Sequence, residues 1–160
     1  MPIQKITPFL CFDTEAEQAA QFYTSVFKNS KIEMVTRYGD SGPRPKGTAM
    51  TVSFEIEGLK FTALNAGPMF KFSEAISFVV TCENQQEVDE LWSKLTSGGG
   101  KELACGWLTD RFGVSWQIVP KRFLEMISDP DPARKDRAMK AMMQMRKFDI
   151  PALEAAFQQE

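Results

Sequence analysis

The side chains of this sequence that could carry out chemistry are thiols and carboxylates. Cys11 and Cys105 could act as nucleophiles, and Glu74 and Asp110 could transfer protons. The chain contains no histidine, so the commonest general base and the commonest metal ligand are both missing. A thiol without a histidine needs another neighbour to lower its pKa, and buried, inert cysteines are therefore the default expectation.

Charged and glycine-rich segments add three candidate features. Arg37 and Arg111 could bind an anionic ligand, although a solvated surface or an ion pair with Asp110 is the simpler interpretation. Residues 39–47 form a loop rich in glycine and proline, which could close over a site or serve as an ordinary connection. Residues 98–100 are three glycines that follow an expected helix, whereas a nucleotide-binding loop places its glycines before the helix.

The composition indicates one globular domain with a packed core. The chain has 160 residues, of which 43% are apolar, including 13 Phe and 3 Trp. Its formal net charge of −2 gives no electrostatic reason to expect nucleic acid or a membrane surface as a partner. No apolar run approaches the ~18 residues of a membrane span, and the first residues lack the apolar segment of a signal peptide. Three cysteines without a CxxC motif fit a reducing compartment, so we expect a cytoplasmic protein.

The elements that would position these side chains are expected to occur twice. Residues 6–12 are predicted to form a strand, and residues 16–27 an amphipathic helix. A shift of 69 positions, which matches Phe9 with Phe78, brings a second strand and a second helical stripe into register. The matched stripes are Ala19, Phe22, Tyr23 and Val26 in the first half and Val88, Leu91, Trp92 and Leu95 in the second.

Three expected strands follow each helix, so the pattern predicts an α+β protein with two tandem βαβββ modules. The strands are residues 32–38, 49–56 and 59–64 in the first module and residues 102–108, a short run at 109–112, and 114–119 in the second. Two helices are expected after them, at residues 133–147 and 152–157. We therefore expect a single domain, 1–160, made of module one at 3–66, module two at 74–119 and a C-terminal helical tail at 120–160.

Six segments carry a resemblance to a known family: residues 6–10, 22–27, 61–65, 71–78, 105–113 and 128–132. In these segments the chain resembles the PhnB-like branch of the glyoxalase/bleomycin-resistance/dioxygenase superfamily, also called the vicinal-oxygen-chelate superfamily. Members of that branch are often labelled 3-demethylubiquinone-9 3-methyltransferase. The resemblance implies that each module curls its sheet into an open half-barrel around a cleft, and that the protein forms a homodimer.

The implied cleft would be lined by aromatic side chains and a few polar groups, which suits a flat, mostly apolar small molecule. Packing in the core is the alternative for each aromatic side chain taken singly. The expected lining residues are Phe9, Cys11, Asn65, Phe70, Phe72, Trp107, Trp116 and Gln117.

Relatives in the superfamily usually hold a divalent metal in this cleft, with ligands from the first and last strands of each module. Carried onto this sequence, within one residue, the ligand positions fall near Thr7, Thr62, Ile76 and Gln117. Of these, Gln117 alone has a side chain that ligates a metal acceptably. We therefore expect the fold without its usual metal, and no other cofactor.

The leading hypothesis from the sequence is a metal-free protein that binds a small, mostly apolar molecule and acts by sequestration. The alternative is a metal-independent enzyme that uses Glu74, Asp110 or Cys105 on a small aromatic or oxoacid substrate. This alternative includes the methyltransferase activity named in the family's label. The sequence disfavours that activity, because it lacks the strand, glycine loop and helix that form a methyl-donor site. A third hypothesis is a structural dimer whose cleft is vestigial.

Overall fold

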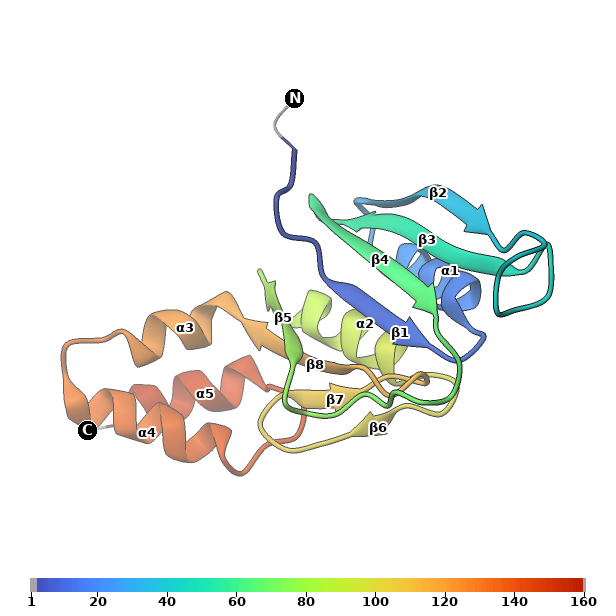
Figure 1. The fold of residues 1–160 in the computed structure, drawn as a ribbon. Helices are drawn as coiled ribbons and strands as arrows, with labels where there is room; N and C mark the ends of the chain where they lie inside the picture. The colour runs from blue at the N-terminus through green and yellow to red at the C-terminus, as the bar shows by residue number, and fades with distance from the viewer. Residues whose placement is uncertain (1–2, 160) are drawn as a thin grey trace. The chain divides into compact units, whose positions relative to one another are not determined.

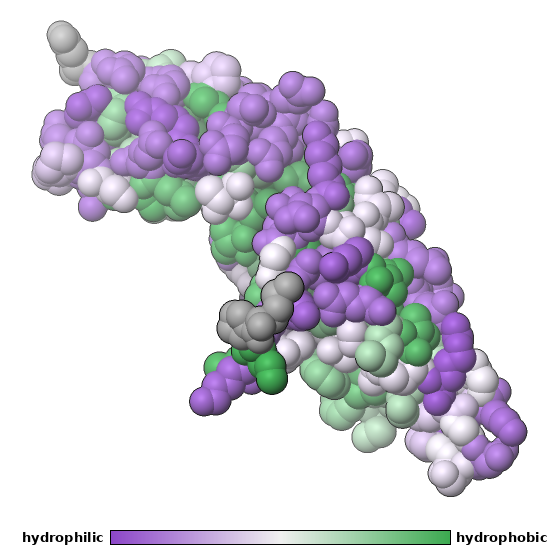
Figure 2. Space-filling view, turned by 90° about the horizontal axis from the view of Figure 1, so that it is seen from above, coloured by the Kyte–Doolittle hydropathy of each residue, from purple (hydrophilic) through white to green (hydrophobic). Residues whose placement is uncertain are grey.

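The computed structural model describes residues 3–159, and the chain in it divides into two compact units between Lys71 and Phe72. Each unit combines a four-stranded open sheet with helices (Figure 1). No helix of the described part of the chain is long and apolar enough to cross a membrane. The visible face in Figure 2 is polar over most of its area, with apolar patches between the polar side chains.

The first unit is one βαβββ module. Its sheet has the order β1-β4-β3-β2, in which β1 runs parallel to β4 and the other pairs are antiparallel. Helix α1 lies against one face of this sheet (Figure 1). The elements are β1 (Phe9–Phe12), α1 (Ala16–Val26), β2 (Ser30–Arg37), β3 (Ala49–Ile56) and β4 (Leu59–Asn65).

Aromatic stacking fixes α1 on the sheet. The ring of Tyr23 lies 5.9 Å from that of Phe54, which in turn lies 5.3 Å from that of Phe61. Ala16, Ala19, Ala20, Tyr23 and Val26 form the buried stripe of the helix. Small residues in the first turns let the helix approach the sheet closely, and burial of each large ring contributes about 1.5–3 kcal/mol.

The second unit repeats the strand order with a longer C-terminal extension. Its sheet has the order β5-β8-β7-β6, and β5 runs parallel to β8. Asn84 caps α2 by accepting a hydrogen bond from the backbone N–H of Glu87 at 2.9 Å. The elements are β5 (Ser77–Cys82), α2 (Gln85–Thr96), β6 (Lys101–Glu102), β7 (Trp107–Thr109), β8 (Ser115–Pro120), α3 (Lys121–Ile127), α4 (Pro132–Met142) and α5 (Ile150–Phe157).

Gln85 attaches the tail to α2 through two hydrogen bonds, and the ion pair of Lys147 with Asp89 at 2.8 Å adds a further link. The Nε2 atom of Gln85 donates to the backbone oxygen of Phe148 at 2.9 Å, and the N–H of Ile150 donates to Gln85 Oε1 at 2.7 Å. The buried ring of Phe148 packs 4.9 Å from that of Phe123 in α3. The C-terminal helices are therefore an integral part of the second unit.

Several boundaries predicted from the sequence were wrong. The expected strand at 102–108 is two short strands, β6 and β7, because Cys105 and Gly106 adopt positive φ angles of 62° and 80° and turn the chain. In the run at 109–112, Thr109 ends β7 and residues 110–112 form a turn around Asp110 instead of a strand. The helix expected at 133–147 ends at Met142, and α3 was not predicted.

The repeat holds for the helices at a shift of 69 positions, but the first strands are out of phase by one residue. Phe9 pairs with Thr62 on the face of the sheet opposite α1, and Val79 pairs with Gln117 in the second sheet. Val79 is 54% exposed, whereas Val80 lies on the more buried side with Cys82. Three residues separate β1 from α1 and two separate β5 from α2, so the strands correspond at a shift of 70.

Candidate functional site

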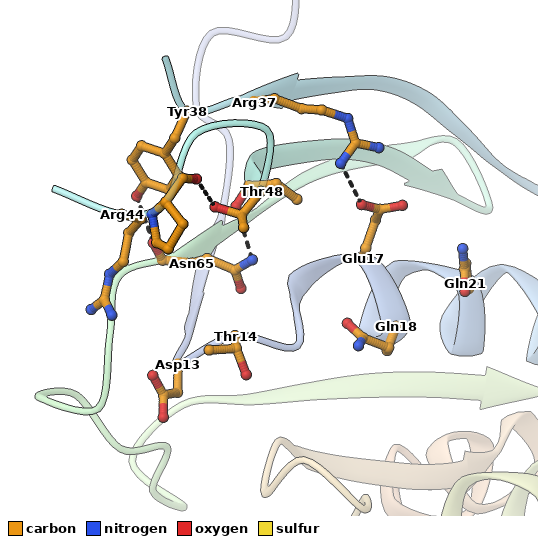
Figure 3. A pocket seen from close by; sticks show the side chains of 12 residues that line it. Asp13, Thr14, Glu17, Gln18, Gln21, Arg37, Tyr38, Arg44, Thr48 and Asn65 are labelled. Atoms are coloured by element: carbon orange, nitrogen blue, oxygen red, sulfur yellow. Dashed lines mark hydrogen bonds and ion pairs between the residues drawn. The ribbon is translucent and has the colours of Figure 1, made fainter. Parts of the chain in front are cut away.

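The first unit contains a pocket of about 520 Å³ between the start of α1 and the loop that joins β2 to β3 (Figure 3). A volume of this size is typical of small-molecule sites. The end of β4 and the start of β3 complete the wall. The lining residues are Asp13, Thr14, Glu17, Gln18, Gln21, Arg37, Tyr38, Arg44, Pro45, Thr48, Ala49 and Asn65.

Asn65, at the end of β4, holds the pocket's elements together. Its Oδ1 accepts a hydrogen bond from the N–H of Ala16 at 2.8 Å, and its Nδ2 donates to the backbone oxygen of Ala49 at 3.0 Å. Its own backbone oxygen accepts from the hydroxyl of Tyr38 at 2.7 Å. Asn65 was predicted from the sequence to be a ligand-binding residue, which remains a prediction. Its side-chain amide joins α1 to β3, so its structural role is to position the wall.

The loop between β2 and β3 is closed by its own hydrogen bonds. The N–H of Tyr38 donates to Thr48 O at 2.9 Å, and the N–H of Gly47 donates to Tyr38 O at 2.8 Å. The Thr48 hydroxyl donates to Pro45 O at 2.7 Å. These bonds place Arg44 and Pro45 in the pocket wall. Closure of this loop over a ligand remains a prediction.

Four charged side chains line the pocket, and two of them form an ion pair. Arg37 Nη1 lies 3.2 Å from Glu17 Oε1, which joins the end of β2 to the first turn of α1. Arg44 and Asp13 line the wall without such a contact among the residues described. In Figure 3 these two side chains lie toward one end of the pocket, and the Arg37–Glu17 pair lies toward the other.

The residues predicted from the sequence to line a cleft are divided between the two units. In the first, Phe9 and Cys11 lie on the face of the sheet opposite α1, where Phe9 is 58% exposed. In the second, Trp107 pairs with Gln117 across β7 and β8. Phe70 is exposed in the segment that precedes the second unit, and Phe72 begins that unit. A shared cleft that contains these side chains remains a prediction.

Trp116 lies on the opposite side of β8 from Gln117. Its indole is buried, with the ring 5.5 Å from that of Phe78, and its Nε1 donates to Asp110 Oδ2 at 3.0 Å. The same carboxylate accepts from the N–H of Phe112 at 2.8 Å and from the N–H of Val114 at 3.1 Å. Asp110 therefore fixes the turn before β8, which is a structural use of the side chain.

The residues predicted from the resemblance to occupy metal positions do not have the side chains that a transition metal prefers. Because the first strands correspond at a shift of 70, the position that matches Thr7 in the second unit is Ser77 and not Ile76. The Ser77 hydroxyl accepts a hydrogen bond from Gln117 Nε2 at 2.9 Å. The resulting donors, hydroxyls from Thr7, Thr62 and Ser77 and one amide, are weak ligands for such ions. Elsewhere in residues 3–159, no three Cys, Asp or Glu side chains cluster to hold a metal. The fold's usual metal does not fit this donor set.

Comparisons with known proteins assign the chain to a family. A family model described as 3-demethylubiquinone-9 3-methyltransferase matches residues 4–119. The chain belongs to this PhnB-like family. A PhnB protein from Bacillus cereus has 38% sequence identity over 73% of this chain and 99% of that one, with a TM-score of 0.67. Among curated protein sequences none matches the chain.

More distant structures share the fold. Protein PA1353 from Pseudomonas aeruginosa is 22% identical over 74% of this chain and 98% of that one, with a TM-score of 0.61. The fosfomycin resistance protein FosX from Listeria monocytogenes, in complex with Mn(II) and sulfate, is 12% identical over 79% of this chain and 98% of its own, with a TM-score of 0.53. The PhnB-like chain therefore has the α+β fold of the glyoxalase/bleomycin-resistance superfamily, as predicted. Its tail at 120–160 lies beyond the family match.

The candidate catalytic residues of this PhnB-like chain lie at separate places in the second unit. Glu74 is exposed before β5, Asp110 is buried in its turn, and Cys105 occupies the positive-φ turn between β6 and β7. The third thiol, Cys82, is fully buried, and burial together with the nearby Glu87 carboxylate raises its pKa to about 12. This thiol stays protonated at neutral pH and is a poor nucleophile.

Sequence analysis did not identify most of the pocket wall. Arg37 was considered as an anion-binding residue, whereas Arg44, Tyr38 and Glu17 were not. A weak signal for Arg44 existed, because it is an arginine within the glycine- and proline-rich loop at 39–47. Arg111, the other arginine considered, donates to Ser97 Oγ at 2.9 Å in the second unit and does not line this pocket.

Proposed function

We propose that this PhnB-like protein binds a small polar molecule in the pocket of its first unit, and that binding requires no transition metal. The pocket carries this proposal. Its volume of about 520 Å³ fits a small-molecule site, and its wall combines charged, amide and hydroxyl groups. The hydrogen bonds of Asn65 join three of the surrounding elements, so the wall is organised before a ligand arrives.

The donor set supports the metal-independent part of the proposal. The hydroxyls of Thr7, Thr62 and Ser77 and the amide of Gln117 are poor partners for a transition metal, as described above. The candidate catalytic carboxylates also support binding over catalysis, because Asp110 is engaged in a turn, Glu74 is exposed, and neither lines the pocket. An apolar ligand among Phe9, Trp107 and Gln117 remains a separate prediction from the sequence.

Native mass spectrometry on the full chain, purified without a metal-affinity tag, tests this function. We expect a small-molecule mass to be retained by the protein and released on denaturation. Treatment with EDTA should leave both that mass and the melting temperature unchanged. Substitution Gln18→Ala or Arg44→Gln should reduce the retained fraction, because both side chains line the pocket. Retention that needs a stoichiometric metal ion, or that is unchanged in both variants, would overturn the proposal.

A further inference from the structure

The charges of the pocket wall leave one cation and one anion available to a ligand. The wall contains two acidic and two basic side chains, so it is formally neutral. Glu17 and Arg37 satisfy one another at 3.2 Å. Within residues 3–159, neither the Asp13 carboxylate nor the Arg44 guanidinium has a hydrogen-bond or ion-pair partner. Asp13 is half-buried, as is Arg44, so both groups have lost part of their hydration.

Gly67 lies beside both the Asp13 backbone and the Arg44 guanidinium. Its N–H donates to the backbone oxygen of Asp13 at 3.4 Å, which keeps the chain after β4 beside the chain before α1. The guanidinium of Arg44 occupies the space that a Cβ atom at Gly67 would need. Gly67 also has a φ of +90°, a conformation that glycine adopts without strain. The backbone therefore brings an unpaired cation and an unpaired anion to the same end of the pocket, as Figure 3 shows.

We propose that the ligand is a small zwitterion, whose oxyanion binds Arg44 and whose protonated amine binds Asp13. This inference rests on the proposed function, since it assumes that the pocket holds the ligand. A guanidinium forms paired hydrogen bonds with a carboxylate or a phosphate, and a carboxylate accepts hydrogen bonds from an ammonium group. A simple anion would leave Asp13 unsatisfied beside added negative charge, and a simple cation would do the same at Arg44. A molecule with both charges satisfies both side chains.

The other pocket residues fit the same class of ligand. Thr14, Gln18 and Thr48 supply neutral hydrogen-bonding groups to the wall, whereas no large aliphatic side chain lines it. The Arg37–Glu17 pair lies toward the other end of the pocket, with its charges already matched (Figure 3). A ligand that is charged at one end and polar along its length is therefore favoured over an apolar one.

Isothermal titration calorimetry with matched probes tests the proposal on the full chain. Three sets are used: L-leucine with isocaproate and isopentylamine, γ-aminobutyrate with butyrate and propylamine, and phosphoethanolamine with ethyl phosphate and ethylamine. We expect at least one zwitterion to bind with a Kd about tenfold lower than both of its singly charged partners. Comparison of the Kd of phosphoethanolamine with those of the two amino acids shows whether Arg44 prefers a phosphate or a carboxylate.

Charge-neutral substitutions link that preference to the two side chains. Arg44→Gln and Asp13→Asn should each weaken binding of the zwitterion about tenfold and bring it level with one singly charged probe. Lys46→Gln and Asp40→Asn serve as matched controls, because this exposed pair at 3.2 Å belongs to the same loop but lies outside the wall. Both controls should bind as the wild type does.

Two outcomes would overturn the inference. The first is that no zwitterion binds more tightly than its singly charged partners. The second is that Arg44→Gln and Asp13→Asn leave the preference unchanged while the circular dichroism of both variants is native. If native mass spectrometry still finds a neutral molecule retained by the pocket, the proposed binding function is supported and the inference of a zwitterionic ligand is rejected. If nothing is retained and no probe binds, both the proposed function and the zwitterionic ligand are rejected.

Discussion

The amide of Asn65 accepts a hydrogen bond from the N–H of Ala16, and through this bond the last residue of β4 supports the first turn of α1. The N-cap residue of the helix, Glu15, makes no side-chain capping bond of its own. A residue that is distant in the sequence thus performs the capping role that Asn84 performs locally for α2.

Substitution Asn65→Ala should lower the free energy of unfolding by about 2–4 kcal/mol, because it leaves the Ala16 N–H and the Ala49 carbonyl buried without partners. Denaturation in urea, followed by circular dichroism, measures the loss. Asn29→Ala is the control, since Asn29 is exposed, and its effect should stay within about 0.5 kcal/mol. Equal effects of the two substitutions would show that the Asn65 amide does not hold α1 in place.

Substitution Gly67→Ala should displace the Arg44 guanidinium and weaken ligand binding. Gly58→Ala provides a close control, because Gly58 has a similar φ of +84° with open space where its Cβ would be. Both substitutions should cost about 1 kcal/mol of stability through backbone strain. The affinity for the preferred zwitterion, measured by calorimetry, should decrease in Gly67→Ala and remain unchanged in Gly58→Ala. A parallel loss in both variants would mean that strain, and not the position of Arg44, governs binding.

Alkaline pH should destabilise the protein in part through Cys82. Its thiol has an ordinary pKa of 9.0, which the fold raises to about 12. Between these values the unfolded chain has lost this proton and the folded chain retains it, so the unfolded state binds fewer protons and stability falls as pH rises. The contribution is fully present below about pH 9 and is lost as pH rises toward 12.

Unfolding free energies measured across this pH range should therefore decline more steeply for the wild type than for Cys82→Ala. A Cys11→Ala variant controls for the loss of a thiol elsewhere in the chain. Alkylation by iodoacetamide, followed by mass spectrometry, should also leave Cys82 unmodified until the protein is unfolded. Rapid alkylation of Cys82 in the native protein would contradict its burial.

Substitution Gln85→Ala should loosen the C-terminal helices from α2. It removes the partners of the Phe148 carbonyl and the Ile150 N–H, at a cost of about 1–3 kcal/mol. Hydrogen exchange should show faster amide exchange in α5 than in the wild type. Gln86→Ala is the control, because the Gln86 amide contacts Glu90 in an exposed position. Unchanged protection of α5 would show that the other contacts, which include Phe148 packing and the Lys147–Asp89 ion pair, are sufficient to retain the tail.

The sequence was sufficient to predict both modules because their helical stripes and alternating strands are local patterns. Residues 49–56 were predicted with the bounds of β3, and Tyr23 and Trp92 occupy buried stripes as expected. The phase of β5 was not predictable from a shift without gaps, since a loop shorter by one residue exchanges the two faces of a strand. The split of 102–108 depends on positive φ at Cys105, a conformation that is uncommon for cysteine.

The pocket could not be predicted from local sequence patterns. Asp13, Arg37, Arg44 and Asn65 come from four segments, which the pairing of β1, β4, β3 and β2 in one sheet brings together. The aromatic lining expected from the resemblance concerns both units and stays a prediction, whereas the polar wall of the first unit depends on loop closure by Tyr38 and Thr48. Residues that are brought into a pocket by loop geometry have no regular spacing in the sequence, so a search for sequence patterns does not find them.

The balanced charges of the pocket wall have a consequence for kinetics. A wall with two positive and two negative side chains produces little long-range field, so it does not attract charged molecules from a distance. The encounter rate with a zwitterion of balanced charge should then vary little with ionic strength, because neither the pocket wall nor that ligand carries a net charge. Added salt would act mainly on the bound complex and shorten its lifetime, so selectivity at this pocket would be expressed in dissociation rates.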